Sequence, residues 1–290
     1  MATIKRGATL KVTLEFTAEE WGAIYPWDSI RAEAAAAVQA EPLLGALIHA
    51  GLLHHRTFHC ALAYRFSLKL ASGEMSEQIL REIADDAHTR EPGLAAAAQA
   101  DLEAVFARDP ACHRLMQPML FFKGFQALQA YRIGHWLWNN GRIDMAYFVQ
   151  MRCSEVFGVD IHPAARIGTG VMIDHAHSIV IGETAVVGND VSMLHSVTLG
   201  GTGKEDGDRH PKIGDGVMIG AGAKVLGDLT IGQHGVLGRQ PRLQLLLPVG
   251  GLELHAHGGR GIGGRITEAG LGAGIADRGK RSRSAGRAEH

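Results

Sequence analysis

The chain has 290 residues, of which 46% are hydrophobic and 38 are glycine, a glycine share about twice the usual ~7%. The apolar content is enough for a sizeable core, and the lack of any run of ~18 apolar residues excludes a membrane-spanning helix. The formal net charge of −1 combines an acidic body with a basic end, because residues 238–290 hold nine Lys or Arg and four Asp or Glu.

The N-terminal residues and the cysteines indicate the cellular compartment. Residues 1–7 lead into mixed polar sequence without the apolar stretch and cleavage site of a secretory signal, so we expect a cytoplasmic location. Cys60, Cys112 and Cys153 lie far apart and form no Cys-x-x-Cys pair, which predicts neither a disulfide framework nor a zinc site. Residues 1–20 are expected to be a poorly ordered extension.

Residues 21–157 are predicted to form an α-helical domain. Residues 27–37 are rich in strong helix formers. Residues 119–138 repeat apolar side chains at three- and four-residue spacing, which is typical of an amphipathic or buried helix. Gly141 then marks the turn of a helical hairpin. All seventeen aromatic residues of the chain lie before Gly158, and we therefore place a domain boundary there.

Residues 158–237 follow a period of six. Glycine follows the repeated position in eight of twelve units, which relieves tight corners. Hexapeptides of this kind predict a parallel β-helix, in which coils of three short strands stack on one another. The repeated position is apolar in every unit: Ile161, Ile167, Ile173, Ile181, Val187, Met193, Leu199, Ile213, Ile219, Val225, Ile231 and Leu237.

Two insertions break this period. Two extra residues lie between Ile173 and Ile181, within the segment Asp174-His-Ala-His. Eight extra residues lie between Leu199 and Ile213, within a polar loop. Insertions in solenoids form loops on a functional face, so we expect the chemistry of the protein at these two places.

Residues 238–290 lose the repeat. The segment has thirteen glycines, eight arginines and no aromatic residue, a composition that predicts an atypical, partly disordered tail. A tail without aromatic side chains for base stacking is a poor nucleic-acid binder. We therefore expect neither a nucleic-acid nor a membrane partner.

Several motifs resemble those of serine acetyltransferases, and the resemblance covers roughly residues 20–235. It implies an α+β fold in which a helical N-terminal domain precedes a left-handed parallel β-helix built of hexapeptide repeats. It also implies a homotrimer, or a dimer of trimers joined through the helical domain, which would contribute to the serine site. The motifs are Trp27-Asp-Ser-Ile-Arg-Ala-Glu-Ala, Arg108-Asp-Pro-Ala, Asp174-His-Ala, Gly200-Gly-Thr-Gly-Lys and Asp208-Arg-His.

The resemblance implies transfer of an acetyl group from acetyl-CoA to the hydroxyl of L-serine, the first step of cysteine synthesis from serine. A serine hydroxyl attacks a thioester only when a base takes its proton, and His175 is the expected base. The resemblance assigns Asp160 to orient that imidazole. It assigns four residues to L-serine, with carboxylates for the ammonium group and basic side chains for the carboxylate: Asp109, Asp174, Arg209 and His210.

The resemblance also places the cosubstrate acetyl-CoA along the coil and requires no metal. Backbone N–H groups of the loop after Leu199 are expected to stabilise the oxyanion of the tetrahedral intermediate. The residues that it assigns to CoA are Gly200, Gly201, Thr202, Gly220, Ala221 and Lys224.

Two other functions stay open at this point. A hexapeptide-type carbonic anhydrase would bind zinc between subunits through histidines, and this chain offers His162, His175, His177 and His195. A catalytically impaired scaffold is the third alternative. The resemblance makes L-cysteine a candidate feedback inhibitor. Docking into the next enzyme of cysteine synthesis is not expected, because the chain ends at His290 and not at the terminal isoleucine that such docking uses.

Overall fold

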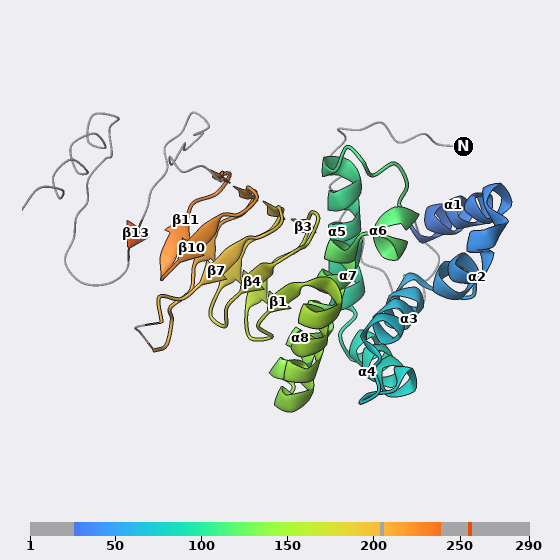
Figure 1. Cartoon of the computed structure of the whole chain (residues 1–290), viewed down its shortest axis with the longest axis horizontal. Coiled ribbons are helices and arrows are strands. Elements are labelled where there is room, and N and C mark those ends of the chain that lie inside the picture. Colours follow the sequence, from blue (N-terminus) through green and yellow to red (C-terminus); the bar gives the residue numbers. More distant parts are fainter. Residues whose placement is uncertain (1–25, 204–205, 239–254, 257–290) are drawn as a thin grey trace, which may run out of the picture. The chain divides into compact units, whose positions relative to one another are not determined.

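The computed structural model describes residues 26–203, 206–238 and 255–256. The expected extension at residues 1–20 lies outside the described residues, and so does the expected tail apart from Gly238 and a two-residue strand. Within the described part, helices come first in the chain and parallel strands follow (Figure 1).

The helical region begins at Trp27 and ends at Phe157. Side-chain oxygens cap two of its helices, with Thr57 accepting a hydrogen bond from the backbone N–H of Cys60 and Ser76 from that of Ile79. The elements are α1 (Trp27–Ala40), the 3₁₀ turn η2 (Pro42–Leu44), α2 (Gly45–Ile48), the π-helical turn η3 (His49–Leu53), α3 (Phe58–Leu70), α4 (Glu77–Arg90), α5 (Gly93–Arg108), α6 (Met116–Leu120), α7 (Lys123–Asn139) and α8 (Ile143–Phe157). None of the described helices is both long and apolar enough to cross a membrane.

α7 and α8 form a hairpin, and a glycine lies after the end of each of these two helices. Gly141 has φ 74° in the turn between the two helices, as the sequence predicts. Gly158 has φ 68° and ends α8 in the left-handed conformation that glycine adopts most easily. The first strand begins at the next residue, Val159.

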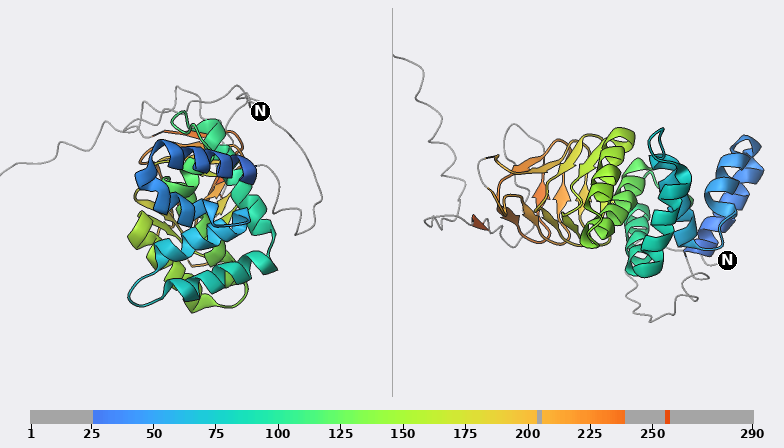
Figure 2. Two further views of the ribbon diagram at one scale, coloured as in Figure 1. Left: turned by 90° about the vertical axis from the view of Figure 1, so that its right-hand side faces the viewer. Right: turned by 90° about the horizontal axis from the view of Figure 1, so that it is seen from below.

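The strands stack in three parallel sheets, one for each side of the coil (Figure 2). Their orders are β1-β4-β7-β10, β2-β5-β8-β11 and β3-β6-β9-β12, and the short strand β13 (His255–Ala256) pairs antiparallel with β11. The strands are β1 (Val159–Ile161), β2 (Arg166–Ile167), β3 (Met172–Ile173), β4 (Ile179–Ile181), β5 (Val186–Val187), β6 (Ser192–Met193), β7 (Thr198–Gly200), β8 (Lys212–Ile213), β9 (Met218–Ile219), β10 (Lys224–Leu226), β11 (Leu229–Ile231) and β12 (Val236–Leu237).

The strand register confirms both predicted insertions. An uninterrupted coil consists of three hexapeptides, and Val180 pairs with Thr198 at that separation in the sequence. Asp160 pairs with Val180, and this separation exceeds an uninterrupted coil by the two inserted residues. Val186 pairs with Lys212, and this separation exceeds an uninterrupted coil by the eight inserted residues of the polar loop.

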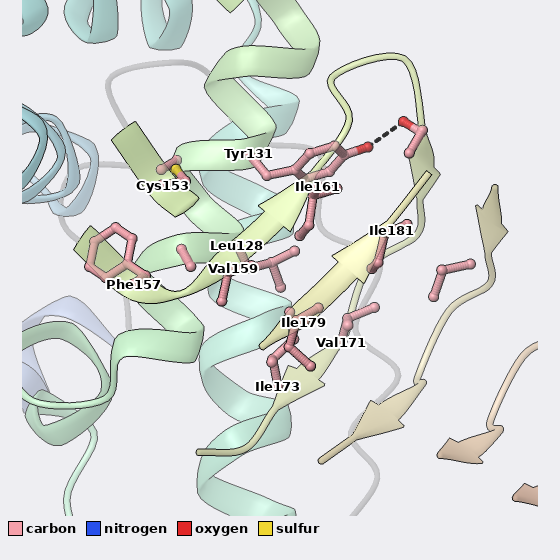
Figure 3. Close-up of a cluster of buried hydrophobic side chains, with 14 of the residues drawn as sticks. Leu128, Tyr131, Cys153, Phe157, Val159, Ile161, Val171, Ile173, Ile179 and Ile181 are labelled. Atoms are coloured by element: carbon pink, nitrogen blue, oxygen red, sulfur yellow. Dashed lines mark hydrogen bonds between the residues drawn. The ribbon is translucent and has the colours of Figure 1, made fainter. Parts of the chain in front are cut away.

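The repeated apolar positions fill the inside of the coil, and ten of the twelve are buried. Their cluster continues into α7 and α8, where Leu128 and Phe157 pack with residues of β1 and β4 (Figure 3). The hydroxyl of Tyr131 donates a hydrogen bond to the Ala165 carbonyl at 2.5 Å. The first coil and the helical hairpin therefore share one core.

Candidate active site

One cavity brings together three of the residues expected at the site. It has a volume of about 560 Å³ and lies between the end of α5, the start of α7 and strand β3. Asp109 lines it from the helical side, and Asp174 and His175 line it from the coil. Phe121, Phe122 and other apolar residues complete the wall. Carboxylates and an imidazole thus face one partly apolar space.

The loop that carries His175 has an unusual backbone. His175, Ala176 and Ser178 have φ values of 58°, 43° and 55°, in the left-handed region that residues other than glycine seldom adopt. The Ala176 N–H closes a tight turn by donating to the Asp174 carbonyl at 2.7 Å. The same conformation occurs at Asp190, Ser196 and His234 in ordinary turns of the coil, so it does not by itself mark a functional site. The two-residue insertion adds a further bend, and His175 is exposed on it.

His175 is open to solvent and has two side-chain neighbours. Its side chain is 70% exposed, and its Nε2 lies 3.4 Å from the nearer carboxylate oxygen of Asp174. The ring of His195, on the next coil, meets it edge to face with the centroids 5.6 Å apart. An exposed imidazole beside a carboxylate is suited to accept a proton from a bound hydroxyl group.

Asp109 is held at the cavity by its neighbour in sequence. The Arg108 guanidinium donates to the carbonyls of Gly170 and Asp190 at 3.0 Å each, and it pairs with the Asp190 carboxylate at 2.7 Å. Asp109 itself accepts a hydrogen bond from the N–H of Ala111 at 2.8 Å. The C-terminal end of α5 is thereby fixed to the first two coils.

Gly124, in the first turn of α7, packs on the chain that leads into the His175 loop. A Cβ atom at this position would lie 2.0 Å from the carbonyl oxygen of Ile173 and 3.1 Å from the Cβ of Ala176. The first of these is a backbone atom, so it cannot move aside without shifting β3. Only glycine allows α7 to approach the loop this closely.

Arg209 and His210 form a second cluster and do not line this cavity. The Arg209 guanidinium pairs with the Glu183 carboxylate at 2.8 Å. The backbone N–H of Arg209 donates to the Thr184 hydroxyl at 3.1 Å. His210 is 6% exposed and contacts Thr184 through Nδ1. The hydrogen bond from Arg209 lowers the pKa of Glu183, and burial lowers the pKa of His210.

Asp160 lies in the middle of β1. Its carboxylate accepts a hydrogen bond from the Gln150 side chain at 2.6 Å. Among the described residues no hydrogen bond or ion pair joins Asp160 to His175. The carboxylate beside His175 within the chain is that of Asp174, and the orienting role of Asp160 stays a prediction.

The residues expected at CoA lie on the later coils. Gly200 ends β7, and a Cβ atom on Gly201 would lie 3.2 Å from the side chain of Arg209. Lys224 begins β10 and donates to the Ser196 carbonyl and the Thr198 hydroxyl at 2.8 Å each. Thr202 lies in the inserted loop after β7, and Gly220 and Ala221 lie between β9 and β10. Their role in binding CoA stays a prediction.

The histidines of the zinc alternative do not form a metal site within the chain. His162 packs against Trp138 and Tyr147, with ring centroids 5.2 and 5.6 Å away. In the part of the chain that the structure describes, no three His, Cys, Asp or Glu side chains converge in a way that could hold a metal ion.

Sequence reasoning gave no role to four residues that support these clusters: Arg108, Gly124, Glu183 and Thr184. The two on the coil could have been found from the repeat. One coil lengthened by the polar loop separates Glu183 from Arg209 and Thr184 from His210, and this offset places the members of each pair side by side. The two on the helices contact the coil through packing that no spacing in the sequence indicates.

Several known proteins that are similar to this chain belong to one family. Residues 26–130 match the family model described as serine acetyltransferase, N-terminal. The serine acetyltransferase of Escherichia coli K12 is 53% identical over 212 residues, which cover 73% of this chain and 78% of that protein.

Solved structures agree. The Neisseria gonorrhoeae serine acetyltransferase in complex with serine is 50% identical, with a TM-score of 0.69 over 74% of this chain and 93% of that one. The Brucella abortus serine acetyltransferase in complex with coenzyme A is 43% identical, with a TM-score of 0.71 over 76% of this chain and 94% of that one. The predicted fold class, a helical region followed by a left-handed parallel β-helix, is confirmed.

Proposed function

Because this chain belongs to the serine acetyltransferase family, we propose that it transfers the acetyl group of acetyl-CoA to L-serine with His175 as the general base. The products are O-acetyl-L-serine and CoA. The observation that carries the role of His175 is that it lines a cavity that Asp109 and Asp174 also line. Membership of this family argues against the carbonic anhydrase alternative.

The proposed reaction has two steps at one imidazole. His175 takes the proton of the serine hydroxyl as the oxygen bonds to the thioester carbonyl carbon, which gives a tetrahedral intermediate. The intermediate then expels the CoA sulfur as its C–S bond breaks, and the protonated imidazole returns the proton to that sulfur. Backbone N–H groups near Gly200 and Gly201 would stabilise the oxyanion. The imidazole supplies the base, so this chemistry needs no metal, and full activity in the presence of a chelator is the check.

Two carboxylates are candidates to orient the imidazole. Asp174 lies 3.4 Å from Nε2 in the chain as it stands, whereas Asp160 is assigned by resemblance. A carboxylate that holds the correct tautomer can contribute strongly to a general base. Asp174 has a second task in this proposal, because with Asp109 it supplies negative charge for the ammonium group of serine.

We propose that the site is completed between copies of the chain. Arg209 and His210 carry the cationic and hydrogen-bonding groups that a serine carboxylate requires, yet they do not line the cavity of their own chain. In a homotrimer these residues of one copy would face the cavity of the next. Leu43, which is 92% exposed, lies with Leu44 and Leu47 on η2 and α2 and is a candidate contact between two such trimers.

CoA would lie along the edge formed by β7 and β10, with Lys224 and the glycines of these coils beside it. L-cysteine carries the same ammonium and carboxylate groups as serine with a thiol in place of the hydroxyl. It would therefore compete with serine at the same charged groups, which makes it the proposed feedback inhibitor.

The proposed function predicts that the purified protein releases CoA from acetyl-CoA only when L-serine is present. The measurement is thiol release followed in time, with D-serine and L-alanine as controls for stereochemistry and for the hydroxyl. L-alanine keeps the charged groups but has no nucleophile, so it is expected to give no release. Absence of L-serine-dependent release from folded protein would support the scaffold alternative.

The packing of Gly124 on the His175 loop predicts that Gly124→Ala lowers kcat/KM at least ~10-fold, because even a shift of ~1 Å in a catalytic group costs up to ~10²-fold. The added methyl group has to displace the Ile173 carbonyl, which lies 2.0 Å from its position. Gly73→Ala is the matched control, since no atom lies within 4 Å of its added Cβ. Equal activity of the two variants would show that the loop tolerates displacement.

A further inference from the structure

His210 lies against the coil beneath it and contacts Thr184 in two ways. The backbone N–H of Thr184 is directed at Nδ1 of His210, with a nitrogen–nitrogen distance of 3.2 Å. The Thr184 hydroxyl oxygen lies 2.9 Å from the same ring nitrogen. The offset between these coils places the two residues opposite each other, because Val186 pairs with Lys212 at the same separation.

These contacts determine which ring nitrogen carries the proton. A backbone N–H can only donate, so Nδ1 of His210 must accept and cannot itself be protonated. The Thr184 hydroxyl then donates to Nδ1 as well, and its oxygen accepts from the Arg209 N–H at 3.1 Å. In a neutral imidazole with an accepting Nδ1, the proton is on Nε2.

The charged groups around His210 favour the neutral ring. Burial is the largest cause that lowers its pKa, and the positive charges of Arg209 and Lys212 lower it further, as does His162. Only Glu183 acts in the opposite direction, and its carboxylate is already paired with Arg209. The ring is therefore poorly suited to take up a proton during the reaction.

The Nε2 edge of the ring rests on a glycine. A Cβ atom at Gly182 would lie 2.0 Å from Nε2 and 2.1 Å from Cδ2 of His210. Nε2 has no hydrogen-bond partner among the residues that the structure describes, yet this atom is not completely buried. This N–H group is thus held in a fixed direction and is free to donate to a ligand.

We propose that Thr184 is a positioning residue: it holds His210 as the neutral Nε2–H tautomer and so directs the hydrogen bond that the proposed function gives His210 toward the carboxylate of the acceptor amino acid. His210 then recognises substrate and takes no part in proton transfer. The tautomer follows from the contacts of the chain alone, whereas the identity of the ligand group rests on the proposed function.

The first test is the protonation state of the ring. In protein with ¹⁵N-labelled histidine, solid-state NMR near neutral pH is expected to show an unprotonated Nδ1 and a protonated Nε2 for His210, identified by the signals missing from His210→Gln. The spectrum needs no substrate, so it tests the tautomer even if the proposed function fails. A protonated Nδ1 would overturn the proposal.

The second test separates binding from chemistry. Thr184→Val keeps the backbone N–H and the shape of the side chain but removes the hydroxyl, so we expect KM for L-serine to rise about 10-fold with kcat within about 3-fold. Thr184→Ser, which restores the hydroxyl, is expected to recover the native KM. A fall in kcat with unchanged KM for Thr184→Val, or a Thr184→Ser variant that does not recover the native KM, would contradict the positioning role.

A third comparison moves the ring without touching Thr184. Gly182→Ala is expected to raise KM for L-serine by at least as much as Thr184→Val, because its methyl group occupies the place of the Nε2 edge. Gly232→Ala is the matched control, since Gly232 also follows a repeated apolar position and has no atom within 4 Å of an added Cβ. Native KM in Gly182→Ala would show that the direction of the ring does not matter.

Discussion

Replacing His175 with asparagine is expected to lower kcat by at least ~10²-fold, the usual contribution of a general base. Asparagine suits this position better than alanine does, because His175 has φ 58° and asparagine tolerates the left-handed region. The variant therefore removes the imidazole while keeping the loop. The measurement is L-serine-dependent CoA release at saturating substrates, with oligomeric state compared by light scattering.

His177→Ala is the control for this experiment. His177 lies two residues further along the same insertion, is exposed and does not line the cavity. A base at His175 predicts near-native kcat in this variant. Equal losses in both variants would show that the loop as a whole is needed for activity and would not support a base at His175. Activity of His175→Asn within about 3-fold of native would remove His175 from the mechanism.

The repeat shows how far the sequence alone reaches. The apolar position at every sixth residue determines which side chains face inward, and the two breaks in that period determine how far apart in the sequence the paired strands lie. The resulting offsets also place His195 beside His175 and Thr184 beside His210. All of this can be derived by counting, because each coil rests directly on the one before it.

The part of the site that the helical region contributes could not be predicted from the repeat. Asp109 and His175 are far apart in sequence and meet only because α5 and α7 pack on the first coil. That packing depends on single contacts, such as the Arg108 guanidinium on two carbonyls, which leave no periodic trace. The left-handed backbone at His175 is also hidden, since no glycine marks it in the sequence.

A buried ion pair between α5 and α7 also contacts the coil. Asp101 on α5 is fully buried, and its carboxylate accepts from Arg132 Nε and Nη2 at 2.9 Å each. It also accepts from the Gln129 amide at 3.0 Å and from the N–H of Val171 at 2.9 Å. Arg132 donates in turn to the Gly168 carbonyl at 2.7 Å. One carboxylate thus joins two helices to the corner of the coil before β3.

Burial and pairing act in opposite directions on this carboxylate. Burial raises the pKa of Asp101, whereas the charge of Arg132 and the four hydrogen bonds favour the ionised form. Such a pair need not stabilise the fold more than apolar side chains of the same volume would. Removing one partner is different, because it leaves the other charge buried and alone.

We therefore expect Asp101→Ala to lower the free energy of unfolding by about 3–5 kcal/mol, the usual cost of breaking a buried pair. The Arg132 side chain, which is 8% exposed, would keep its charge without a partner. Denaturant unfolding at equal protomer concentration is the measurement, since assembly makes the apparent stability depend on concentration.

The double variant Asp101→Leu with Arg132→Met separates the charge from the packing. It removes both charges and keeps apolar volume, so it is expected to recover most of the stability that Asp101→Ala loses. If the double variant is as unstable as the single one, the pair is needed for its hydrogen bonds to Gly168 and Val171 and not only for charge balance. A loss below about 1 kcal/mol in Asp101→Ala would mean that water reaches Arg132 and that this contact does not hold the helices on the coil.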